Sequence, residues 1–156
     1  MTQHLAKPVV PTDTASRKPE HPYASYKIIT SYEGGSFSLS DAPAPDSEYD
    51  VDVTRKEQAH FTLSLNTYSM DDDEARSLAQ AASDWFKFIG YHYLVGCNVV
   101  VVSTTNITDR TQQIVDDYEC RYGFDVRLRA ARGLVKRLEA IENHHVTGTI
   151  NTKGEE

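Results

Sequence analysis

One stretch of alternating residues, Tyr118 to Ala130, constrains the fold of this chain more than any other feature of its sequence. Every second residue is apolar or aromatic, and the residues between them are charged or glycine. This period of two is typical of a β-strand, because successive side chains point to opposite faces of a sheet. At about 3.3 Å per residue the stretch would span roughly 40 Å, more than a small core needs. We therefore predict a long, two-sided strand that reaches toward a neighbouring molecule.

The charged side of this strand is the candidate interaction site. It would carry Glu119, Arg121, Asp125, Arg127 and Arg129. Because acidic and basic residues are mixed on it, a charge-paired surface explains this side more simply than DNA binding does. A long strand also exposes backbone edges that a second subunit can cover. We predict that these five residues contribute to a subunit interface.

Further patterns predict a sheet with helices. β-Branched, aromatic or alternating residues favour strands at Tyr23 to Tyr32, Tyr49 to Ser69 and within Cys97 to Ile107. Apolar residues at helical spacing predict an amphipathic helix from Asp71 to Ile89, capped by Ser69 or Asp71 and ended by Gly90. Its predicted apolar positions are Ala75, Leu78, Ala79, Ala82, Phe86 and Ile89.

The chain of 156 residues fits one domain with tails. The predicted fold is α/β, of the α+β kind, with a mostly antiparallel sheet flanked by one or two helices over residues 23–150. Four prolines favour an extended N-terminal arm over residues 1–22, a poor candidate for the core. Ser40 to Glu48 is predicted to be a mobile loop. The pattern over residues 132–150 fits a helix or a strand; we assign a final strand to Glu142 to Ile150 and a tail to residues 151–156.

Composition disfavours several classes of protein. The net charge of −7 and a pI near 5.3 oppose general binding to nucleic acid or anionic membranes. An apolar run long enough for a membrane span or an export signal is not present, so we expect the protein to act where it is made or in something assembled there. Cys97 and Cys120 have no redox or metal-type spacing and are expected to be buried thiols.

Catalytic and metal-binding patterns are weak. Clustered carboxylates at Asp71 to Glu74 suit a hard cation, but their place in the first turn of a helix explains them without one. His144 and His145, with His92 or His60, could bind a metal; adjacent strand residues, however, point to opposite faces. A third set could line a ligand pocket but is more typical of a core or a subunit contact: Trp85, Phe86, Phe88, Tyr91 and Tyr93. We expect no catalytic residue, cofactor or metal.

The order of three segments resembles the neck or tail terminator proteins of tailed bacteriophages. "KPEHPYASYKI" is similar to that family's proline-rich entry into the first strand. "QAHFTLSLNTYSMDDDEARSLAQAASDWF" is similar to its strand followed by a helix with an acidic start. "NITDRTQQIVDDYECRYGFDVRLRA" is similar to its closing strand. The resemblance covers residues 19–150, and only Met1 to Lys18 precede it, so a helix that often begins the family would be shortened or absent.

The resemblance implies a structural virion protein rather than an enzyme. It implies a homo-hexameric ring on the last ring of the tail tube, which stops tube growth and binds the head-completion proteins of the connector. DNA would only pass through the channel, no membrane would be involved, and the ring would assemble in the host cytoplasm. Two alternatives remain open. One is a small phage-encoded enzyme or ligand-binding domain that uses Trp85, His92 and the acidic cluster; the other is an acidic inhibitor of a host protein.

Overall fold

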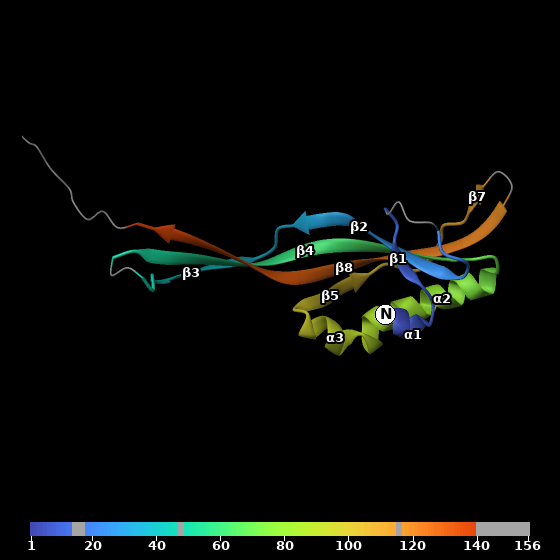
Figure 1. Ribbon diagram of the computed structural model, residues 1–156, viewed down its shortest axis with the longest axis horizontal. Coiled ribbons are helices and arrows are strands. Elements are labelled where there is room, and N and C mark those ends of the chain that lie inside the picture. Colours follow the sequence, from blue (N-terminus) through green and yellow to red (C-terminus); the bar gives the residue numbers. More distant parts are fainter. Residues whose placement is uncertain (14–17, 47–48, 115–116, 140–156) are drawn as a thin grey trace, which may run out of the picture. The chain divides into compact units, whose positions relative to one another are not determined.

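The computed structural model describes residues 1–13, 18–46, 49–114 and 117–139, with the elements labelled in Figure 1. These residues group into two compact units. The larger, which we call the sheet unit, comprises residues 1–37 and 57–132. The smaller, which we call the ribbon unit, comprises, among the described residues, 38–46, 49–56 and 133–139. Two long strands, β4 (Val51–Ser69) and β8 (Asp117–Leu138), contribute residues to both units.

The strands form a mostly antiparallel sheet, as predicted. Its order is β1 (Val9–Pro11), β2 (Tyr23–Glu33), β4, β8 and β5 (Val99–Thr104). β1 runs parallel to β2, whereas β2 with β4 and β5 with β8 are antiparallel. Three further strands extend the pairing: β3 (Phe37–Pro43) pairs with β4, and β6 (Thr108–Asp109) and β7 (Gln112–Ile114) pair with β8.

The helices lie on one side of the sheet within the sheet unit (Figure 1). α2 (Asp72–Asp84) continues as a π-helical turn, η1 (Trp85–Ile89), and is followed by α3 (Tyr91–Gly96); α1 (Thr2–Leu5) is a short N-terminal turn. Asp71 caps α2 as predicted, since its side chain accepts a hydrogen bond of 2.8 Å from the Glu74 amide. Gly90 follows the last residue of η1, and a Cβ there would lie 2.6 Å from the Trp85 ring, so glycine is required at this position.

The core confirms the two-sided strand. Phe124 and Val126 are fully buried, and Leu128 is nearly so. Phe124 meets the ring of Phe86 edge-on at 6.3 Å between centroids. Burial of large apolar side chains such as these supplies most of the free energy of folding. The other buried members of the core are Leu5, Ala24, Leu65, Leu78, Ala82 and Trp85.

Three features differ from the predictions for the ends and loops. Residues 40–43, predicted to belong to a mobile loop, lie in β3. Leu5 is buried in the core although the N-terminal arm was expected to contribute little, and Pro11 is accommodated because β1 is a short edge strand. Residues 132–138 continue β8. The predicted strand at residues 142–150 and the tail at 151–156 lie outside the described residues.

The predicted apolar face of the helix is buried except at its C-terminal residue. Ala75, Leu78, Ala79 and Ala82 are buried as expected, but Ile89 is exposed. A π-helical turn holds more residues than an α-helical turn and so rotates the following side chains away from the original face.

Among the described residues, no helix has the length and apolar content needed to cross a membrane.

Candidate functional site

Glu119, the first member of the charged face of β8, is buried in an ion cluster. Its side chain is only 10% exposed, and its carboxylate lies 2.6 Å from the Lys18 ammonium and also contacts the His21 ring. Burial alone would raise the pKa of Glu119, but the hydrogen bonds from Lys18 and His21 hold it below its usual value. Glu119 therefore fastens the segment before β2 to the sheet.

Two stacked tyrosines continue this cluster. Tyr23 and Tyr68 are cross-strand partners on β2 and β4, with ring centroids 4.6 Å apart. The Arg121 guanidinium lies 5.4 Å from the centre of the Tyr68 ring, a cation–π arrangement. Burial, and then the charge of Glu119, raise the pKa of the Tyr23 hydroxyl well above its ordinary value. The second predicted interface residue, Arg121, thus also has partners within its own subunit.

Asp125 is held by Arg110, a residue that the sequence patterns did not single out. The Arg110 guanidinium lies 3.1 Å from the Asp125 carboxylate and also donates to Ser64 at 2.9 Å and to Asn66 at 3.1 Å. Ser64 donates to the same carboxylate at 2.6 Å. Arg110 follows β6, whose pairing with β8 brings it to this place, so only the fold could have identified it.

The last two residues of the charged face differ from each other. Arg127 donates to Glu33 at 2.6 Å, and both side chains are partly exposed. Arg129 is exposed, and no carboxylate among the described residues pairs with it. Four of the five predicted residues therefore have partners within the subunit, while Arg129 is exposed without a carboxylate partner among the described residues.

The acidic cluster at the start of α2 is a helix cap. Besides the Asp71 cap, Asp72 accepts from the Tyr122 hydroxyl at 2.9 Å, Glu74 accepts from Ser69 at 2.6 Å, and Asp73 pairs with Arg76. Because the four carboxylates serve different partners, they do not converge on one point. Within the described part of the chain, no group of three histidine, cysteine, aspartate or glutamate side chains is arranged to hold a metal ion.

The histidine candidates do not form a site in the described structure. His92 is exposed on α3, where its ring meets Tyr91. His60 lies on β4, and its Nδ1 atom is buried without a hydrogen bond. His144 and His145 lie outside the described residues.

The predicted aromatic cluster divides into two groups. Trp85 and Phe86 are buried and meet edge-on at 5.1 Å between centroids. Phe88, Tyr91 and Tyr93 are exposed, Phe88 by 82% and Tyr93 by 68%. Ile89 and Val95 are exposed beside them. We call these five exposed side chains, on η1 and α3, the aromatic corner.

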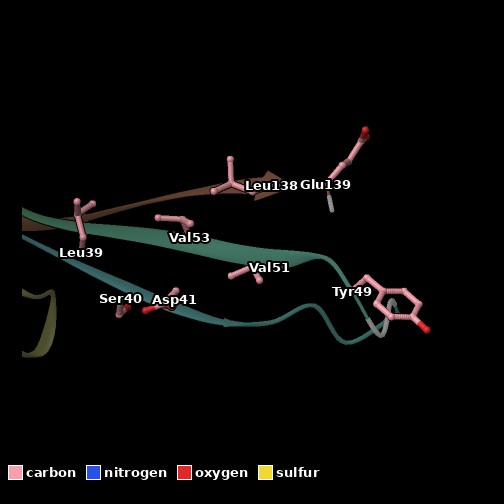
Figure 2. A pocket seen from close by; sticks show the side chains of 8 residues that line it. All are labelled: Leu39, Ser40, Asp41, Tyr49, Val51, Val53, Leu138 and Glu139. Atoms are coloured by element: carbon pink, nitrogen blue, oxygen red, sulfur yellow. The ribbon is translucent and has the colours of Figure 1, made fainter. Parts of the chain in front are cut away.

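Two hollows in the described structure are lined mainly by apolar side chains. One, of about 370 Å³, lies in the sheet unit and is lined by apolar side chains and Tyr26, without any acid, base or thiol. The other, of about 430 Å³, lies in the ribbon unit and is shown in Figure 2. We call it the ribbon groove. Its lining consists of Leu39, Ser40, Asp41, Tyr49, Val51, Val53, Leu138 and Glu139.

The cysteines are both free, but only one is buried. Cys120 is buried as predicted, whereas Cys97 is exposed directly after α3. Burial, followed by the nearby Asp72 and Asp71 carboxylates, raises the pKa of the Cys120 thiol. Cys97 is therefore the more reactive of the two.

Comparison with known proteins yields one family. A family described as phage neck terminator protein has a model that matches residues 1–155. No curated protein matches the chain significantly.

Proposed function

This chain belongs to the phage neck terminator family, and from that membership we propose that it forms a hexameric ring that caps the tail tube. The family consists of structural proteins of the phage neck, not enzymes, so the chain is a virion component that interacts with other tail or neck proteins. In the proposed ring it stops elongation of the tube and joins the tail to the head-completion proteins. Assembly takes place in the host cytoplasm.

The observation that carries this proposal is the set of large apolar side chains that the single chain leaves exposed. Groups of exposed apolar side chains are uncommon on soluble monomers and mark interaction sites. The aromatic corner exposes three aromatic rings, and the ribbon unit exposes Leu39 and Tyr49, each by 63%. The apolar hollow of the sheet unit is lined by no acid, base or thiol. These features together favour a subunit that packs against other subunits in an assembly.

The charged face of β8 supports the same proposal in part. Arg129 is available for a contact with another subunit, and the exposed Arg127 and Glu33 pair can extend that contact. Glu119, Arg121 and Asp125 shape the face through the partners they hold inside the subunit. We propose that this face lies at the edge of the interface.

The net charge of the chain, −7, suits a channel for DNA in transit. A surface of the same sign as the phosphate backbone does not hold the duplex, so DNA can slide past. In this proposal DNA is a passing molecule, not a bound partner.

Native mass spectrometry of the purified chain, alone and with tail-tube assemblies, tests the proposal. Hexamers, or saturable capping of tube ends seen by electron microscopy, are the expected result. A chain that stays monomeric and ignores tubes would contradict the ring. Steeply salt-dependent binding to a basic host protein would instead support the inhibitor alternative.

A further inference from the structure

The ribbon groove and the aromatic corner are complementary surfaces. We propose that the groove of one subunit receives the aromatic corner of a second copy of the chain. This inference rests on the proposed ring and identifies the contact that closes it. Neither surface is needed to build the core, and both remain uncovered in the single chain.

The ribbon unit lacks a core of its own among its described residues. Ala44 is its only buried apolar side chain there. Arg137 of β8 pairs with Asp52 of β4 at 3.0 Å and with Asp46, in the turn after β3, at 2.8 Å, but exposed ion pairs contribute little stability. A few strands with one apolar face need that face packed against something. Covering the groove would thus stabilise the ribbon unit.

Figure 2 shows apolar side chains from all three strands of the ribbon unit along the groove. Leu39 comes from β3, Val51 and Val53 come from β4, and Leu138 comes from β8. Asp41 and Glu139 add two carboxylates to the lining. The groove therefore favours an apolar occupant with a positive charge at its edge.

The aromatic corner has those properties. Each buried aromatic ring removes on the order of 200 Å² from water, so Phe88, Tyr91 and Tyr93 can supply several hundred Å² of contact. From Trp85 to Gly96 the chain contains Lys87 and His92 but no carboxylate. Lys87 is exposed next to Phe88, where it can approach Asp41 or Glu139 of the groove. The aromatic corner therefore matches the ribbon groove in its apolar character and, through Lys87, in charge.

A contact between two different surfaces of the same chain is head-to-tail. Such heterologous contacts generate a closed ring when the rotation between neighbours closes and an open filament when it does not, whereas a self-complementary patch generates dimers. With a second copy of this chain as the occupant, each subunit places its corner in the groove of one neighbour and receives the corner of the other neighbour in its own groove.

Two single substitutions break the contact from either side. Leu39→Asp places a charge in the groove, and Phe88→Asp places one on the corner; both positions are exposed, so the subunit should fold. Each variant should need a roughly tenfold or higher concentration to form hexamers. Ala42→Asp, on the same strand but outside the groove lining, and Tyr118→Asp, an exposed aromatic outside the corner, are matched controls and should assemble normally.

Mixing the two variants gives the sharper result. Leu39→Asp retains an intact corner and Phe88→Asp retains an intact groove, so an equimolar mixture can form one good contact per pair. Native mass spectrometry, in whichever condition the unaltered chain forms hexamers, should show monomers for each variant alone. The mixture should show a species of twice the monomer mass, with one chain of each kind, and no hexamer.

Other outcomes separate the two proposals. If the unaltered chain and both variants are hexameric, the ring stands and the contact assigned here is wrong. If each variant is monomeric and their mixture is too, the corner does not enter the groove. If the unaltered chain never assembles, with or without tubes, both the contact and the proposed function fail.

Discussion

The ammonium of Lys18 lies 2.6 Å from the carboxylate of Glu119, and this ion pair links the segment before β2 to strand β8. The carboxylate is largely buried, while the ammonium is half-exposed. His21 contacts the same oxygen, and the charge of this carboxylate contributes to the raised pKa of the nearby Tyr23 hydroxyl. A residue first identified as a surface charge is therefore the centre of a polar cluster that orders the N-terminal segment.

Glu119→Ala should lower the free energy of unfolding by about 1–3 kcal/mol, because it leaves the His21 ring and the Lys18 ammonium without their acceptor. Urea denaturation followed by circular dichroism measures the change. Lys18→Ala is the comparison, and its effect should be smaller because that side chain is half-exposed. Equal, negligible effects would mean that the cluster does not stabilise the subunit.

The same carboxylate should make stability depend on pH. Its folded-state pKa lies below the reference value of 4.5, so the folded state binds the proton less tightly than the unfolded state does. The contribution is present above the unfolded-state pKa and is lost as pH falls through the folded-state pKa. The stability difference between the unaltered chain and Glu119→Gln should therefore shrink in acid. A difference that stays constant from neutral to acidic pH would contradict this assignment.

Two glycines on β8 should respond oppositely to alanine. A Cβ on Gly123 would lie 2.4 Å from the Asn66 side-chain oxygen and 2.7 Å from the Leu65 carbonyl oxygen. On Gly133 it would meet nothing within 4 Å. Gly123→Ala should cost about 1–3 kcal/mol of unfolding free energy, whereas Gly133→Ala should be neutral or slightly stabilising. Thermal unfolding of the two variants tests the pair, and a tolerated Gly123→Ala would mean that β4 and β8 are less closely packed here.

The sequence predicted what depends on local periodicity. Phe124 and Val126 are buried because alternation fixes which face of a strand they occupy, and Asp71 caps α2 because a cap needs only nearby amides. β3 was missed because Ser40, Asp41 and Pro43 are residues typical of loops, and the alternation of Phe37 and Leu39 with serine is too short to outweigh them. The exposure of Ile89 was missed because a π-helical turn changes the period.

The candidate site was predicted less completely. The sequence identified the charged residues of β8, but their partners lie on other segments: Arg110 and Ser64 contact Asp125, and Lys18 contacts Glu119. Opposite charges on one strand face cannot show whether they pair with each other, with distant residues or with another subunit. The role of this face at an interface stays a prediction.

Arg129→Glu should leave the subunit folded but weaken ring assembly. Its exposed side chain has no carboxylate partner among the described residues, so the unfolding free energy should change by no more than about 0.5 kcal/mol. Native mass spectrometry should show fewer hexamers. The comparison is Arg127→Glu, which replaces the ion pair with Glu33 by two negative charges. Adding Glu33→Arg in the same chain restores a pair of opposite charges and should restore any assembly that Arg127→Glu loses. Normal hexamers from Arg129→Glu, and phage tails of normal length, would exclude this face from the interface.

The two cysteines should report separately on folding and on assembly. Cys97 is exposed directly after α3, while burial and the nearby carboxylates keep Cys120 as an unreactive thiol. A thiol reagent should therefore modify one cysteine in the folded monomer and both in denaturant, as counted by mass spectrometry. Cys97→Ser should abolish the fast reaction. If the aromatic corner is covered in the ring, Cys97 should also react more slowly in hexamers than in Phe88→Asp monomers; equal rates would mean that α3 remains open to solvent after assembly.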